Sequence, residues 1–346
     1  MATMPLPSEL PIIQAPMAGG PSTPELTAAV GRAGGFGFLA AGYLTPDQLV
    51  ATIAETRALG DAPFGVNIFF PSTPSDVAPV RRYAELIQPE SDRLGVALGD
   101  PHWDDDDFGD KLEIVASEQV SMVSFTFGCP DPAAVDRLHR AGCRVAVTVT
   151  SVAEARIAEQ ADADLVVVQG TEAGGHQSSF VDLAPNLRPL STLLGEIGGS
   201  TTVPLVGSGG IMSGTHIAEV LGMGAVGVQL GTAFLCADEA GTSATYRRAL
   251  LDRTYDDTML TRAFSGRYAR GLANRFAVTY SDAAPEAYPE VHFLTRPLRS
   301  AATRAGDPGT PNLWAGQGWR SAATGPVAAL MGRLASELEA GGTPGR

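Results

Sequence analysis

Three glycine-rich clusters follow the last three predicted strands, and the second and third of them are suited to binding a phosphate group. They span residues 169–176, 207–211 and 229–233. Gly209 and Gly210 carry no side chain that would keep an anion away from backbone N–H groups. Gly231 and Thr232 add further N–H groups and a hydroxyl where a helix is expected to begin. Two such clusters in consecutive loops predict a phosphate site, whereas one cluster alone would fit a simple tight turn equally well.

His176 is the titratable residue best placed for proton transfer or for hydrogen bonding to a substrate. It follows three small residues near the end of a predicted strand. Imidazole has an ordinary pKa of about 6.5 and exchanges protons near neutral pH. A purely structural histidine is the alternative. His139 and His216 lie in predicted outer helices. His102 borders an acidic run at 104–107, for which a solvated loop is favoured over a metal site, and His292 lies in the segment after the last strand with no role assigned.

Residues at other strand ends could contact a flat, polar cofactor. Met17, in the segment Ala15-Pro16-Met17 after the first strand, offers a soft side chain for the face of an aromatic ring. Asn67 and Gln169 end the third and sixth strands, and their amides can both donate and accept hydrogen bonds. Each residue could equally pack in the core or bond to neighbouring backbone, so each is a weak indication by itself.

Other common catalytic motifs are missing from the sequence. It has no G-x-S-x-G, no H-E-x-x-H and no C-x-x-C, so neither a serine hydrolase nor a zinc site is predicted. No lysine follows the glycines at 207–211 as it would in a P-loop. We therefore expect no metal site.

The composition predicts a globular protein that does not bind nucleic acid. The chain has 346 residues, 44% of them hydrophobic and 18% charged, with a net charge of −14. This acidic balance disfavours binding to nucleic-acid backbones and anionic membranes. The sequence has no apolar run of about 18 residues and no signal-peptide pattern. Its three widely spaced cysteines fit a reducing compartment, which predicts a cytoplasmic location.

Short apolar segments alternate with amphipathic segments along most of the chain. The expected strands are 11–14, 37–41, 64–69, 122–125, 145–148, 165–169, 203–207 and 225–229. The expected helices are 23–33, 46–59, 132–141, 152–161, 190–195 and 214–223. Non-alternating strands rich in Val, Ile and Phe are typical of parallel sheets buried on both faces. Eight such units, without a G-x-G-x-x-G turn, favour an α/β fold of the (β/α)8 TIM-barrel class over a doubly wound sheet.

Two segments interrupt this alternation. Residues 71–120 are a long connection between the third and fourth strands, and residues 239–303 are rich in arginine, with a helical pattern and no further strand. We interpret the second segment as a small helical lid domain over the strand ends. A helix at 321–338 is expected to complete the barrel wall. The predicted domains are a cofactor-binding TIM barrel at 1–238 and 305–346 and a helical substrate or lid domain at 239–304.

Taken together and in order, these motifs resemble the nitronate monooxygenase family, formerly called 2-nitropropane dioxygenases. The matching segments are 11–17 (PIIQAPM), 34–37 (GGFG), 65–67 (GVN), 169–176 (QGTEAGGH), 207–211 (GSGGI) and 229–235 (QLGTAFL). The resemblance extends over nearly the whole chain. Each motif is modest alone, but six in order at barrel spacing are specific for this group of flavin-dependent enzymes.

The resemblance implies a TIM barrel that binds FMN without a covalent link and oxidises alkyl nitronates, such as propionate 3-nitronate, with O2 to a carbonyl compound and nitrite. His176 would face the substrate and be catalytic. It implies small-molecule partners only, nitronate and O2, in a monomer or homodimer. The implied cofactor-binding residues are Ala15, Pro16, Met17, Asn67, Gln169, Gly174, Gly175, Gly207, Gly209, Gly210, Gln229, Leu230, Gly231 and Thr232.

Two departures from the family leave the substrate pocket open. Thr126 stands where close relatives are expected to carry a histidine, and the segment ending in Trp319-Arg320 lacks the tyrosine and lysine of some relatives. The alternative function is an FMN-dependent NAD(P)H reductase of the quinone or enoyl-acyl-carrier-protein type. Ala233 argues against it, because the acyl reductases are expected to have an arginine after Gly-Thr. A flavin- or phosphate-binding protein without catalysis is a third possibility, and His176 argues against that one.

Overall fold

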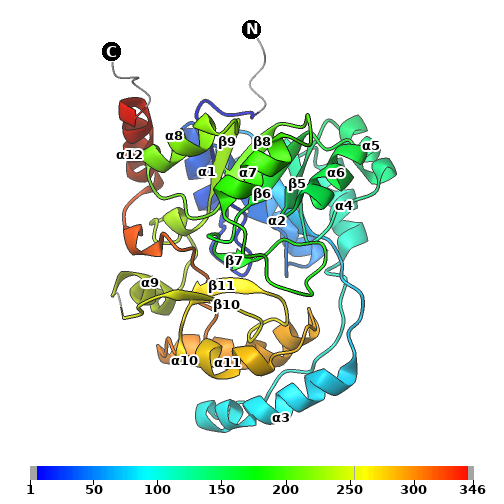
Figure 1. Cartoon of the computed structure of the whole chain (residues 1–346), viewed down its shortest axis with the longest axis vertical. Helices are drawn as coiled ribbons and strands as arrows, with labels where there is room; N and C mark the ends of the chain where they lie inside the picture. Colours follow the sequence, from blue (N-terminus) through cyan, green and yellow to red (C-terminus); the bar gives the residue numbers. More distant parts are fainter. Residues whose placement is uncertain (1–5, 253, 342–346) are drawn as a thin grey trace.

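The chain folds around a closed barrel of eight parallel strands, as predicted (Figure 1). The computed structural model describes residues 6–252 and 254–341. The neighbouring strands run in the order β1-β9-β8-β6-β5-β4-β3-β2, and a bridge between Ile13 and Phe36 joins β1 to the start of β2. The barrel strands are β1 (Ile12–Gln14), β2 (Gly37–Ala40), β3 (Phe64–Phe69), β4 (Met122–Thr126), β5 (Arg144–Val149), β6 (Leu165–Gln169), β8 (Leu205–Ser208) and β9 (Gly227–Leu230).

The barrel strands are buried on both faces, which explains their unbroken apolar sequences. In β6, Val167 belongs to the cluster inside the barrel, whereas Val166 and Val168 belong to the cluster between the barrel and its helices. An alternating polar pattern would place polar groups in one of these two layers, where burial without a partner is costly.

An outer ring of helices covers the barrel. Thr45 begins one of them with a capping box in which its hydroxyl and the side chain of Gln48 each bond to the other residue's backbone N–H. The last helix packs against α1 and α8, but it starts after Pro326 and a separate 3₁₀ turn rather than at residue 321. The helices are α1 (Pro24–Arg32), α2 (Pro46–Ala58), α4 (Phe108–Ser117), α5 (Pro132–Arg140), α6 (Val152–Gln160), α7 (Leu190–Gly198), α8 (Gly214–Gly222) and α12 (Val327–Gly341).

The segment after the barrel contains two strands, so the prediction of a purely helical lid was wrong on this point. The strands β10 and β11 form an antiparallel sheet, and β11 pairs with β7, a two-residue strand that contains His176. A search for apolar runs misses such four-residue strands, whose pairing partner is distant in sequence. The elements of this segment are α9 (Ala244–Leu251), β10 (Thr258–Thr261), β11 (Ala269–Leu272), α10 (Arg275–Tyr280) and α11 (Glu290–Ala305), with β7 at Gly175–His176.

Helix α3 (Val77–Leu94), from the connection between β3 and α4, packs on the segment after the barrel rather than on the barrel itself (Figure 1). We call this segment, together with α3, the small region. Tyr83 and Ile87 of α3 share an apolar cluster with Leu294 and Leu298 of α11. The Tyr83 hydroxyl donates to the carbonyl oxygen of Ala263 at 2.7 Å. The small region is therefore assembled from two segments far apart in the sequence.

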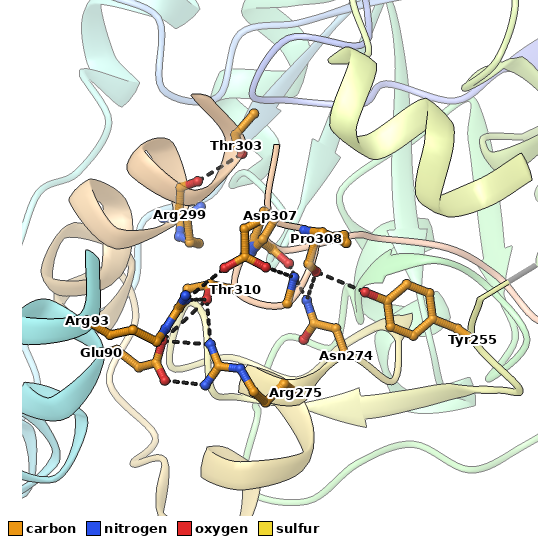
Figure 2. A network of polar contacts seen from close by, with 12 residues as sticks. Glu90, Arg93, Tyr255, Asn274, Arg275, Arg299, Thr303, Asp307, Pro308 and Thr310 are labelled. Atoms are coloured by element: carbon orange, nitrogen blue, oxygen red, sulfur yellow. Dashed lines mark hydrogen bonds and ion pairs between the residues drawn. The ribbon is translucent and has the colours of Figure 1, made fainter. Parts of the chain in front are cut away.

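A buried carboxylate fixes the end of α3 to this region (Figure 2). Both Nη atoms of Arg275 donate to Glu90, and Arg93 Nε donates to the same carboxylate at 3.0 Å. Arg93 also reaches Asp307 at 2.8 Å. Burial alone would raise the pKa of Glu90, but the hydrogen bonds from Arg275 and Arg93 lower it below its usual value.

Candidate active site

A cavity of about 630 Å³ lies at the C-terminal ends of the barrel strands, between the barrel and the small region. Its volume is within the range typical of ligand and cofactor sites, about 300–1,000 Å³. Most of the residues predicted for the site line it. They are Ala15, Pro16, Met17, Asn67, Gln169, Gly174, Gly175, His176, Gly209, Gly210, Gln229, Gly231 and Thr232.

Gly207 and Leu230 are the predicted residues that point away from the cavity. A Cβ on Gly207 would lie 2.5 Å from Val220 of α8, so this glycine permits close packing of strand and helix. Leu230 is 1% exposed and belongs to the apolar cluster between barrel and helices. Neighbouring residues along a strand face opposite sides, which a motif by itself does not reveal.

One end of the cavity is formed by backbone. Gly209 and Gly210 have φ angles of 134° and 69°, which L-residues with side chains rarely adopt. Within the described residues, their N–H groups have no hydrogen-bond partner. The Gly214 N–H at the start of α8, in contrast, donates to Glu337 at 2.7 Å. The glycine turn is thus the better candidate for binding an anion.

The three predicted amide side chains have different environments. The Asn67 Nδ2 donates to Ser124 and Thr126 at 2.9 and 3.0 Å, so its Oδ1 is the atom left to accept a bond from a ligand. Gln169 bonds to the carbonyl of His176 and to the N–H of Ser178 and therefore positions the His176 loop. The side chain of Gln229 has no described hydrogen bond and lines the cavity.

His176 is oriented by a serine that the sequence analysis did not identify. Its Nε2 lies 2.8 Å from Ser265 Oγ, which donates to the carbonyl oxygen of Arg267 at 3.2 Å. Because the hydroxyl has one proton, it accepts the bond from Nε2–H, and Nδ1 remains the basic nitrogen. The ladder between β7 and β11 holds the backbone of His176 as well.

The imidazole of His176 is neutral at physiological pH. Burial, together with the positive charges of Arg267 and Arg299, lowers its pKa from 6.5 to about 3. The expectation of an imidazole that titrates near neutral pH was therefore wrong, because the sequence does not show the depth of the site or the arginines around it.

The opposite wall of the cavity consists of side chains that sequence reasoning missed. Tyr43 stacks on His292 with ring centroids 4.1 Å apart, and its hydroxyl lies 3.2 Å from that of Tyr288. Arg299 donates to His292 Nδ1 at 3.2 Å. The signal that was available is the spacing of His292, Arg296 and Arg299 along one face of a helix.

The acidic run at 104–107 supports this wall instead of being wholly solvated. Asp106 accepts from the backbone N–H of Tyr43 at 2.8 Å, and its other oxygen lies 2.8 Å from Nζ of Lys111, which is fully buried. Burial raises the pKa of Asp106, while Lys111 opposes that shift. Asp104 and Asp105 are exposed, and the described residues contain no cluster suited to a metal ion.

The fold is a closed parallel barrel with a cofactor-sized cavity at the ends of its strands. The glycine turn and the buried His176 line this cavity. These features together are typical of a (β/α)8-barrel enzyme. The profile of the nitronate monooxygenase family matches residues 6–337. The chain therefore belongs to the nitronate monooxygenase family, and it is a flavin-dependent oxidoreductase. None of the helices in the described part of the chain combines the length and hydrophobicity needed to cross a bilayer.

Individual relatives agree with this assignment. A probable nitronate monooxygenase of Staphylococcus aureus is 36% identical over 95% of this chain and 94% of its own length, and one of Staphylococcus saprophyticus is 37% identical over 89% and 88%. The structure of nitroalkane oxidase from Streptomyces ansochromogenes is 47% identical, with a TM-score of 0.94 over 96% of this chain and 97% of that one. FabK from Thermotoga maritima is similar at 27% identity, with a TM-score of 0.76 over 98% and 95%.

Proposed function

We propose that this enzyme uses non-covalently bound FMN to oxidise alkyl nitronates with O2, giving a carbonyl compound and nitrite. The proposal is supported by membership of the family, by the cavity at the strand ends and by the glycine turn within it. The single observation that favours a nitronate over a neutral nitroalkane is the low pKa of His176.

The residues present fit FMN. The free N–H groups of Gly209 and Gly210, with Gly231 and Thr232 beside them, suit the phosphate. The other residues assigned to the flavin face the same cavity: Ala15, Pro16, Met17, Asn67, Gln169, Gly174, Gly175 and Gln229. When bound, FMN supplies the two-electron acceptor that O2 can reoxidise. In this proposal the barrel, formed within 1–238 and 305–346, binds the cofactor, and 239–304, with α3 packed on it, covers the substrate.

The state of His176 determines which substrate form suits the site. A general base works best when its pKa is near the working pH, and a neutral imidazole with a pKa of about 3 is a weak base. A nitronate arrives already deprotonated and needs no base. A nitronate bound beside the imidazole would raise its pKa by charge attraction, so His176 can then share a proton with the nitronate oxygens and hold them in place.

The remaining assignments follow from composition and family. We place the enzyme in the cytoplasm because its three cysteines are free, and we expect only small-molecule partners and a monomer or homodimer. The reductase alternative, acting on a quinone or an enoyl-acyl-carrier protein with NAD(P)H, is the second candidate, and one experiment tests both.

The test is an anaerobic titration of the purified flavin-loaded enzyme with propionate 3-nitronate, followed by the flavin absorbance near roughly 450 nm. We expect bleaching that air reverses, with nitrite formed in proportion. A parallel titration with NADH should leave the band unchanged over the same time. Bleaching by NADH and not by nitronate would instead establish the reductase. A protein that takes up no FMN would contradict the cofactor assignment itself.

A further inference from the structure

Arg299 is a deeply placed cation that no carboxylate of the described residues pairs with. Its Nε donates to Thr295 Oγ1 at 3.0 Å and its Nη1 to Asn312 Oδ1 at 3.0 Å. Its Nη2 donates to the backbone oxygen of His292 at 2.9 Å and to the Nδ1 of the same residue. All these acceptors are neutral, so they fix the guanidinium in place without compensating its charge.

Arg299 borders the cavity and keeps its charge there. Arg299 lines the cavity, and one of its five N–H groups has no described acceptor. Burial lowers its pKa to about 10, which leaves it protonated at neutral pH. An uncompensated charge in such a place costs free energy in the empty protein, and a bound anion would offset that cost.

The surroundings make this region a local exception in an acidic protein. Arg296 and Arg304 project from the same helix and line the same cavity, although the chain carries a net charge of −14. His292 stays neutral beside them, because burial and Arg299 lower its pKa well below 6.5. The positive field at this wall therefore comes from arginines, which attract anions into the cavity.

A chain of contacts between aromatic rings connects His176 to Arg299. His176 lies 5.7 Å from the ring of Tyr288, whose hydroxyl contacts Tyr43, and Tyr43 stacks on His292. Arg299 in turn donates to His292. A nitronate that reaches both His176 and Arg299 would need a second anionic group for the arginine, and a carboxylate at its other end supplies one.

We infer that Arg299 is the specificity-determining residue for a carboxylate at the far end of the substrate, and that it selects carboxylated nitronates over simple alkyl nitronates. This inference rests on the proposed function. A fixed guanidinium matches a carboxylate in shape and charge, and Arg296 and Arg304 guide the anion towards it.

The test compares two nitronates of equal chain length, propionate 3-nitronate and propyl 1-nitronate, in the flavin-loaded enzyme. We expect the wild type to prefer the carboxylated compound in kcat/KM by at least about tenfold, the size of one charge-assisted hydrogen bond. Arg299→Met should lose that preference, because kcat/KM should fall much more for propionate 3-nitronate than for propyl 1-nitronate. Arg299→Lys should recover part of it. Arg140→Met, which removes a surface arginine paired with Asp136 on α5, is the matched control and should behave as wild type.

A binding measurement keeps the inference testable if Arg299→Met folds poorly. Butyrate and its neutral isostere butyramide are titrated into the wild-type enzyme by calorimetry. We expect binding of butyrate only, in competition with propionate 3-nitronate. Equal loss of both nitronates in Arg299→Met, an unchanged preference, or equal binding of butyrate and butyramide would each overturn the role of Arg299. Turnover of neither nitronate by the wild type would contradict the proposed function instead, and the butyrate titration would still test the arginine.

Discussion

The two ends of the cavity are built in different ways. At the barrel end, the surface is backbone exposed by glycine, as at Gly209 and Gly210. At the other end it is made of large side chains, Tyr43, His292 and Arg299, held by stacking and hydrogen bonds. The first end comes from consecutive strand-to-helix loops, whereas the second is assembled from segments about 250 residues apart.

This difference indicates how the two ends can vary. A backbone site depends on the path of the chain, and a side chain at its glycines would strain that path. A side-chain site can change its chemistry by one substitution without altering the barrel.

The largest expected effect comes from closing the backbone end. In the native turn, Gly210 has a φ of 69°, and a Cβ added there would lie 3.0 Å from Glu172 Cβ. A valine is strained at this φ and crowds Glu172, so the turn must shift in Gly210→Val. We expect a folded protein without flavin and without nitronate turnover. The measurement is the flavin-to-protein absorbance ratio after reconstitution, with circular dichroism to verify folding.

The control is Gly222→Ala on α8, where an added Cβ meets nothing within 4 Å. That variant should bind flavin as the wild type does. Stoichiometric flavin in Gly210→Val would show that the phosphate does not depend on this turn, and the contrast between the two ends of the cavity would fail.

A smaller effect is expected at the junction of the two ends, where His176 lies. His176→Asn should keep its flavin, because the glycine turn is untouched, and lose roughly 10²-fold in kcat/KM for a nitronate, as when one fixed hydrogen-bonding group is removed from an active site. Steady-state nitrite release measures the loss. The exposed His216→Asn is the control on α8. Undiminished turnover by His176→Asn would remove the residue from the mechanism.

The sequence predicted the parts of the molecule that obey local rules. The strands are unbroken apolar runs because they are buried on two faces, and the glycine loops follow them, so the barrel could be predicted. Twelve of the fourteen residues proposed for the cofactor line the cavity at its strand ends. The other two, Gly207 and Leu230, face away from the cavity, and a motif does not tell which way a residue faces. Strands β10 and β11 were missed because their pairing with β7 is non-local.

The side-chain wall could not be predicted for the same reason. Tyr43 is positioned by Asp106 of the acidic run, which looked like a solvated loop, and His292 has its neighbours only after α11 folds over the barrel. Nothing local marks Lys111, a fully buried cation, as the partner of Asp106. Long-range packing decides these positions, and a single sequence contains no direct record of it.

The smallest expected effect is a pH dependence of stability that distinguishes the buried histidine from exposed ones. The folded pKa of His176 is about 3 against an ordinary 6.5, so between these values the unfolded chain binds a proton that the native chain does not. The free energy of unfolding therefore falls as the pH drops below about 6.5. Unfolding of flavin-free protein by urea at pH 7, 6 and 5 should show a shallower decline in His176→Asn than in the wild type, and an unchanged decline in His216→Asn. Parallel declines in all three proteins would mean that the pKa of His176 stays near its ordinary value in the native state, and the imidazole would then be partly protonated near neutral pH.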